Sequence, residues 1–274
     1  MSEAPDSILV AVAQFAPTDD PVHNRDLVTA FVAVAAARGA RLVVFPEYSS
    51  YFVHPLGEGF VRNAEGLDGE FVGTLARAAD EHGVFVVAGL VERVPEADRF
   101  SNTLVAVAPS AGIVATYRKQ HLYDAFGARE SDWVVPGGLG EPQTFEVDGV
   151  PVGMQTCYDI RFPEVTRTLA DAGAELILVP AEWVRGPLKE HHWRTLVTAR
   201  AIENTVYVAA ADHAPPIGVG TSLIVDPMGV ALAAIGETTG VAVAEVSRAR
   251  VADVRETNPS LALRRYRVEP VSPA

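Results

Sequence analysis

Short apolar runs alternate with helical patterns along the chain. Residues 8–15 (ILVAVAQF) are apolar and rich in β-branched side chains, which is typical of a strand buried on both faces. Asn24 then caps a predicted helix that ends near Arg38, with Gly39 in the C-terminal capping position. The alternation continues with predicted strands at residues 41–45, 84–90, 103–108, 113–117, 152–156, 175–179, 206–211, 221–225 and 241–246, and helices at 69–82, 163–172 and 187–204. It predicts an α/β fold with an irregular stretch at 120–146 and an extended tail from about residue 260.

Two distant segments repeat one pattern. Residues 39–48 read GARLVVFPEY and residues 173–183 read GAELILVPAEW, so each has a helix stop, a buried strand, a proline and an acid. We interpret the repeat as a sign of two similar halves whose strand ends, with Glu47 and Glu182, converge on one site. Chance similarity of two simple buried strands is the alternative.

Composition narrows the classes of partner. The net charge is -13 and the chain has 22 basic residues, of which only Lys119 and Lys189 are lysines, so nucleic acid and membrane surfaces are not expected partners. Hydrophobic residues make up 49% of the 274 residues, which favours a single domain over residues 1–274 with a large core. The single cysteine and the lack of a secretory signal in residues 1–6 predict a cytoplasmic protein.

Cys157 is the first candidate for chemistry. It follows the predicted strand at 152–156 and precedes Pro163, which suits the first turn of a helix. A turn between strand and helix presents the sulfur at the sheet edge and leaves the backbone N–H of Tyr158 close enough to stabilise an oxyanion. The alternative is a buried cysteine that only fills space.

Glu47 and Lys119 are the next candidates. Glu47 follows an apolar strand and a proline, where burial would raise the pKa of its carboxyl group towards the range of a general base. Lys119 ends the predicted strand at 113–117 in a chain that otherwise prefers arginine, and a compact ammonium suits an oxyanion. Structural alternatives are an ion-paired or solvated glutamate and a surface lysine.

These segments together resemble the nitrilase superfamily of carbon-nitrogen hydrolases. The resemblance rests on FPEY at residues 45–48, YRKQHLYD at 117–124, CYDIRFPE at 157–164 and ARAIEN at 199–204. It implies a four-layer α-β-β-α sandwich, assembly as a homodimer or higher homo-oligomer, and no metal or organic cofactor. It also implies a catalytic set of Glu47, Lys119 and Cys157, and a second glutamate after the lysine, for which Glu130 is the matching residue.

The resemblance favours an amidase that converts a small linear amide to a carboxylic acid and ammonia through a thioester on Cys157. An N-carbamoyl hydrolase, a nitrilase and a catalytically silent binding scaffold remain alternatives. A metal-dependent amidohydrolase is disfavoured because none of its candidate ligands, His121, Asp124, His191, His192 and His213, has the expected helical spacing.

Other polar and aromatic residues receive supporting roles. Tyr48, Trp183 and His191 are candidates for pocket walls, although an aromatic side chain near a strand end is more often part of the core. We expect Asp159 and Arg161 to brace the turn around the cysteine by a salt bridge. Arg200 and Glu203 have the spacing to pair across one helical turn.

Overall fold

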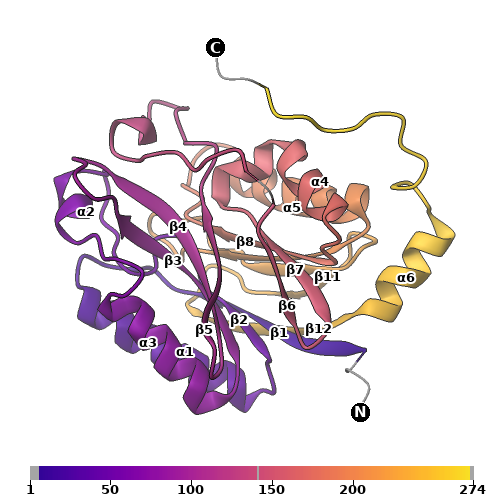
Figure 1. Ribbon diagram of the computed structural model, residues 1–274, viewed down its shortest axis with the longest axis horizontal. Coiled ribbons are helices and arrows are strands. Elements are labelled where there is room, and N and C mark those ends of the chain that lie inside the picture. Colours follow the sequence, from indigo (N-terminus) through magenta and orange to yellow (C-terminus); the bar gives the residue numbers. More distant parts are fainter. Residues whose placement is uncertain (1–5, 141, 272–274) are drawn as a thin grey trace.

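The computed structural model describes residues 6–140 and 142–271, which form two facing β-sheets with helices on their outer faces (Figure 1). Each sheet has six strands. The first sheet has the order β12-β1-β2-β3-β4-β5 and consists of β1 (Ser7–Gln14), β2 (Leu42–Val44), β3 (Phe85–Arg93), β4 (Phe100–Ala108), β5 (Gly112–Arg118) and β12 (Gly240–Ser247).

The second sheet repeats this arrangement. It has the order β11-β10-β9-β8-β7-β6 and consists of β6 (Thr144–Val147), β7 (Val150–Met154), β8 (Leu176–Ala181), β9 (Tyr207–Asp212), β10 (Leu223–Val225) and β11 (Ala231–Ala234). In the first sheet, β1, β2 and β3 are parallel and are flanked by antiparallel strands, and β7, β8 and β9 have the same relation in the second. β2 and β8 therefore occupy equivalent positions, as the sequence repeat predicted.

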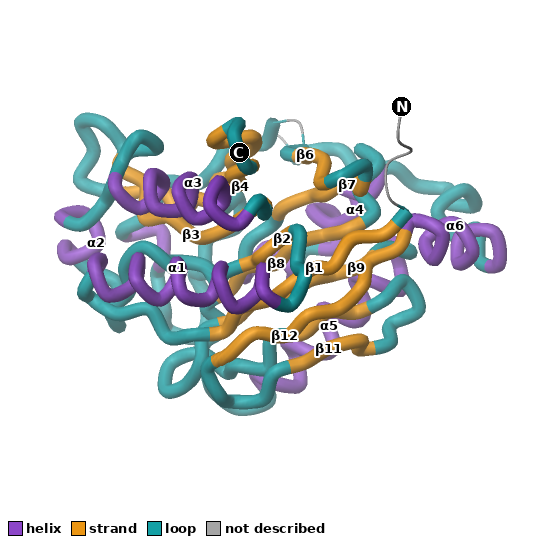
Figure 2. The backbone as a smooth tube through the Cα atoms, turned by 90° about the horizontal axis from the view of Figure 1, so that it is seen from below, coloured by secondary structure: helices purple, strands orange, loops and turns teal. Residues whose placement is uncertain are grey.

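Helices cover both outer faces of the pair of sheets (Figure 2). Helices α1 (Pro21–Ala37) and α3 (Glu70–His82) share an apolar cluster with the first sheet, and α4 (Pro163–Asp171) and α5 (Lys189–Asn204) share one with the second. A third cluster joins the inner faces of the two sheets, through side chains such as Val44 and Leu178. These layers confirm the predicted α-β-β-α sandwich.

The start of α1 differs from the prediction. Asp20, not Asn24, is the N-cap, because its side chain accepts hydrogen bonds from the N–H groups of Val22 and His23 while Pro21 occupies the first turn. Asn24 is buried inside the helix, where its side-chain amide donates to the carbonyl oxygens of Thr18 and Ser50.

Several short elements were not predicted. They are α2 (Glu58–Arg62), α6 (Arg248–Thr257), β6, β11 and the 3-10 turns η1 (Glu130–Asp132) and η2 (Cys157–Arg161). Most are too short to show a periodic pattern, and β11 is largely exposed. Residues 260–271 form no helix or strand, in agreement with the predicted tail. Pro273 of that tail lies outside the described residues, and so do residues 1–5 of the N-terminal segment in which we expect no secretory signal. No helix in the described ranges has the length and apolar character needed to cross a membrane.

Candidate active site

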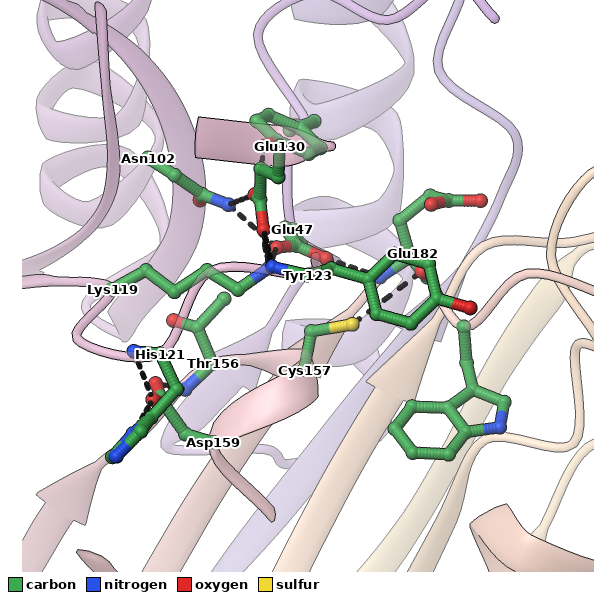
Figure 3. A network of polar contacts seen from close by, with 12 residues as sticks. Glu47, Asn102, Lys119, His121, Tyr123, Glu130, Thr156, Cys157, Asp159 and Glu182 are labelled. Atoms are coloured by element: carbon green, nitrogen blue, oxygen red, sulfur yellow. Dashed lines mark hydrogen bonds and ion pairs between the residues drawn. The ribbon is translucent and has the colours of Figure 1, made fainter. Parts of the chain in front are cut away.

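The ends of β2, β5 and β7 bring three candidate residues together (Figure 3). Glu47 follows β2 and Pro46, Lys119 follows β5 directly, and Cys157 begins the η2 turn shortly after β7. All three side chains are buried. Because β2 and β5 belong to one sheet and β7 to the other, the cluster lies where the two sheets meet.

Two carboxylates hold the lysine. Lys119 Nζ donates to Glu47 Oε1 at 2.9 Å and to Glu130 Oε1 at 3.0 Å. Asn102 Nδ2 lies 2.6 Å from Glu47 Oε1, and the backbone N–H of Glu182 donates to Glu47 Oε2 at 2.7 Å. Both oxygens of Glu47 are therefore held in place by donors from three different segments.

The protonation states follow from burial and neighbouring charge. Burial raises the pKa of Glu47, and the charge of Lys119 only partly opposes that shift. Burial is the largest single effect on Lys119 and Glu130 and disfavours their charged forms, but neighbouring charges and hydrogen bonds together outweigh it. The pKa of Lys119, next to Glu130 and Glu47, therefore lies well above its ordinary value, and that of Glu130, held by Lys119 and Tyr48, lies below. Lys119 thus remains a cation and Glu130 a carboxylate, while Glu47 is the group best suited to take up and release a proton.

Cys157 sits at a sharp turn with a backbone φ of 45°, a left-handed conformation that is uncommon for a non-glycine residue. Its Sγ donates to the carbonyl oxygen of Glu182 at 3.4 Å. Burial and the negative charge of Glu47 raise the pKa of the thiol well above its usual value. The resting sulfur is therefore a thiol, and it needs a base before it can attack.

The cluster opens into a pocket of about 1060 Å³. Its walls include the predicted residues Tyr48 and Trp183, and also Tyr158, Tyr123 and Lys189. The hydroxyl group of Tyr48 donates to Glu130 Oε1 at 2.6 Å. The prediction that His191 forms a wall is wrong, because this residue is exposed on α5 and is not among the residues that line the pocket.

Comparison with known proteins identifies the family. The carbon-nitrogen hydrolase family matches residues 9–256. The chain belongs to the carbon-nitrogen hydrolase family. It is 42% identical over 260 residues to the deaminated glutathione amidase of Escherichia coli O157:H7, an alignment that covers 94% of this chain and 98% of that protein.

Two solved structures resemble this carbon-nitrogen hydrolase. The C. elegans NitFhit protein matches with a TM-score of 0.87 and 27% identity over 96% of this chain, which spans 66% of that longer protein. A mutant of the amidase from Nesterenkonia sp. AN1 matches with a TM-score of 0.76 and 27% identity, over 94% of both chains. That structure shows covalent addition of the acetamide moiety of fluoroacetamide at the active-site cysteine.

The predicted salt bridge between Asp159 and Arg161 is wrong for this hydrolase. Asp159 is buried and accepts hydrogen bonds from the hydroxyl group of Tyr117 at 2.7 Å and from the N–H groups of His121 and Thr156 at 2.9 and 3.1 Å. It thereby ties the segment after Lys119 to the turn that carries Cys157. Arg161 packs instead over the ring of Trp183, at 4.8 Å from its centroid.

The predicted pair of Arg200 and Glu203 is present, with Nη1 and Oε1 2.8 Å apart. Arg200 also donates to the carbonyl oxygen of Ile160 through Nε and Nη2, at 3.0 and 2.7 Å. This arginine therefore supports the end of the η2 turn in addition to closing a turn of α5.

The backbone of Glu47 depends on two residues that the sequence did not reveal. Gly89 on β3 packs so closely that a Cβ atom there would lie 2.4 Å from the backbone nitrogen of Tyr48 and 2.7 Å from Cα of Glu47. His213 Nε2 lies 2.7 Å from the carbonyl oxygen of Glu47. Burial lowers the pKa of this histidine to about 4, so near neutral pH it is uncharged and donates to that carbonyl.

Proposed function

We propose that the protein is an amidase that hydrolyses a small linear amide to a carboxylic acid and ammonia, with Cys157 as nucleophile. The observation that carries the proposal is the position of Glu47, whose carboxyl group accepts hydrogen bonds from Lys119 and from the backbone N–H of Glu182. The carbonyl oxygen of Glu182 accepts a hydrogen bond from the thiol of Cys157. These contacts support the roles of Glu47 as base, Lys119 as cation and Cys157 as nucleophile, the combination that covalent catalysis requires.

In the proposed acylation step, Glu47 takes the thiol proton while Sγ forms a bond to the carbonyl carbon of the amide. The resulting oxyanion is stabilised by Lys119 Nζ and by the backbone N–H of Tyr158, which has no intrahelical acceptor in the first turn of η2. Glu47 then gives its proton to the nitrogen as the carbon-nitrogen bond breaks, and ammonia leaves.

In the deacylation step, Glu47 takes a proton from water, and the hydroxide attacks the thioester. The carbon-sulfur bond breaks, the acid leaves, and the thiolate recovers the proton from Glu47. Glu130 keeps Lys119 charged and oriented throughout, because its carboxylate contacts Nζ at 2.9 Å.

We further propose that the substrate carries an anionic group away from the scissile bond. Lys189 Nζ lies over the rings of Tyr123 and Trp183, at 4.8 and 5.2 Å from their centroids, and donates to the hydroxyl group of Tyr123. Arg161 lies over Trp183, and its Nε is buried with no hydrogen-bond partner among the described residues. A carboxylate on the substrate would supply the charge that these two cations lack. The deaminated glutathione named for the Escherichia coli relative is a compound of this chemical kind.

Ammonia release from a panel of amides, nitriles and N-carbamoyl amino acids tests the activity, with Cys157→Ala measured alongside. We expect the parent protein to hydrolyse amides and Cys157→Ala to hydrolyse them more slowly by a factor of about 10⁴ or more. Faster turnover of nitriles or of carbamoyl compounds than of amides would instead indicate a nitrilase or an N-carbamoyl hydrolase. Absence of turnover in every class would favour a binding scaffold.

The anionic group is tested separately with glutaramate and butyramide, which differ by one carboxylate. Lys189→Gln should lower the ratio of their kcat/KM values by about tenfold, because a hydrogen bond to a charged group contributes about 1.5 kcal/mol or more. An unchanged ratio would contradict this part of the proposal.

We also propose a homodimer formed from a single-domain protomer. Leu263, Tyr266 and Val271 in the tail expose 70%, 92% and 84% of their surface, which supports a contact with a second copy. The apolar cluster shared by the two sheets supports one domain. A solution mass equal to that of one 29.2 kDa chain would contradict the dimer. The expected cytoplasmic location stays a prediction.

A further inference from the structure

Glu182 is a partly buried acid beside Glu47 and Cys157 for which the mechanism above has no use. It directly follows β8, its backbone N–H donates to Glu47 at 2.7 Å, and its carbonyl oxygen accepts from Cys157 Sγ at 3.4 Å. Its side chain lines the pocket. In Figure 3 its carboxyl group points away from Lys119 and Glu130, and no dashed line reaches it.

This carboxyl group is not held by a cation in the way that Lys119 holds Glu47 and Glu130. Oε1 is buried and has no hydrogen-bond partner among the residues that the structure describes. Burial, followed by the negative charges of Glu47 and Asp212, raises the pKa of Glu182 well above its usual value, and the charge of Lys119 does not compensate. The group is therefore a neutral carboxylic acid, which offers one O–H donor and one C=O acceptor.

The position of Glu182 determines which part of a substrate it meets. Its backbone contacts both Glu47 and the sulfur of Cys157, so a substrate carbon bonded to that sulfur would lie close to the backbone of Glu182. A glutamate side chain extends only a few bonds from its backbone, which places its carboxyl group next to the acyl substituents closest to that carbon. The leaving nitrogen, in contrast, must lie within reach of Glu47.

Local charge determines what kind of group fits there. An anion would meet the negative charge of Glu47, which already disfavours ionisation of Glu182. A cation would lie near Lys189, whose own pKa is lowered by burial and by the neighbouring Arg161. A neutral polar group that donates or accepts a hydrogen bond is the remaining class.

We propose that Glu182 is a specificity residue that binds a neutral hydroxyl, keto or N–H group on the atom next to the scissile carbonyl carbon. The inference rests on the proposed amidase function and narrows its substrates to amides that are polar at this atom. A carbamoyl compound carries an N–H at the same position, so Glu182 would also provide the second polar contact that such a compound needs.

Lactamide and propionamide test the inference, since they share one skeleton and differ by a hydroxyl group on the atom in question. The variants are Glu182→Leu, Glu182→Gln, which retains a donor and an acceptor, and Glu256→Gln, an exposed acid on α6 that serves as the matched control. Glu182→Leu should lower the ratio of kcat/KM for lactamide over propionamide by about tenfold or more, mainly through KM. Glu182→Gln and the control should keep the ratio near that of the parent protein.

The pH dependence of this ratio separates recognition from a purely structural role. In the parent protein the ratio should change as Glu182 ionises at high pH, whereas in Glu182→Gln it should stay constant because an amide does not titrate. The inference would be overturned if the ratio were the same in Glu182→Leu as in the parent protein. It would also be overturned if the ratio changed with pH in Glu182→Gln in the same way as in the parent protein.

Binding of the two amides to Cys157→Ala, with and without Glu182→Leu, provides a readout that does not need turnover. If neither amide is hydrolysed but lactamide binds at least tenfold tighter than propionamide only when Glu182 is present, the proposed function fails and the inference stands. Equal binding of both amides in both proteins would overturn the inference itself.

Discussion

Glu47 and Glu182 follow the equivalent strands β2 and β8 of two sheets with the same strand order, yet their surroundings differ. Oε1 of Glu47 accepts from Lys119 and Asn102, whereas Oε1 of Glu182 has no partner in the described part of the chain. The pKa of both is raised by burial, but only Glu47 has a cation close enough to oppose the shift strongly. The ends of equivalent strands thus carry two carboxyl groups, although Glu182 lies one residue further from its proline than Glu47 does. In the proposed mechanism the neighbouring lysine distinguishes the base from the second acid.

The largest effect expected from this comparison comes from matched substitutions at the two acids. Glu47→Gln should lower kcat by about 10² to 10⁴, because it removes the group that moves the proton. Glu182→Gln should lower it by about tenfold or less, because the amide retains a donor and an acceptor at that place. Single-turnover measurement of thioester formation checks both, and similar losses in the two variants would contradict the assigned difference.

A smaller effect is expected when the backbone of Glu47 is displaced without touching its carboxyl group. In Gly89→Ala the new methyl group would collide with the backbone of Glu47 and Tyr48, so one of the strands must shift. Displacement of a catalytic group by about 1 Å costs roughly a hundredfold in rate. Gly138→Ala, where a Cβ atom meets nothing within 4 Å, is the matched control and should behave like the parent protein in kcat assays.

A third test concerns the contact of His213 with the carbonyl oxygen of Glu47. We expect the loss of this contact to change the stability of the protein more than its reaction rate. The folded protein protonates this histidine only near pH 4, whereas the unfolded chain does so near pH 6.5. The unfolded state therefore binds more protons between these values, and stability falls as the pH falls. From pH 6.5 to 5 the loss due to this group is about 2 kcal/mol.

His213→Gln should remove that part of the pH dependence while the amide continues to donate to the same carbonyl oxygen. Urea unfolding of both proteins at pH 7 and pH 5 measures the difference. A loss of stability on acidification that is the same in the variant and the parent would show that the histidine is not the group responsible.

Local sequence signals account for much of the fold and for the core of the site. The apolar strand followed by proline predicted the position of Glu47, and the strand, turn and helix around Cys157 predicted its position at the edge of a sheet. Asn102 and His213 gave no such signal, because each lies in or beside a buried strand and becomes a site residue only through contacts with distant segments. Glu182 was visible in the repeat, but its lack of a counter-charge depends on how both sheets pack.

The cap of α1 shows a second limit of the sequence. Asp20 and Asn24 are both good capping residues, and the choice between them depends on Pro21 and on the buried contacts of Asn24 with Thr18 and Ser50. Local propensity alone ranks the two about equally. Tertiary contacts decide between them.

The left-handed backbone of Cys157 has a consequence for the evolution of this fold. A non-glycine residue with a φ of 45° costs on the order of 1 kcal/mol or more relative to glycine. Glycine at this position would relax the turn but would also remove a buried sulfur that packs in an apolar cluster. The conformational cost falls on the side chain that the proposed mechanism needs, so selection for a relaxed turn and selection for the proposed activity favour different residues at position 157.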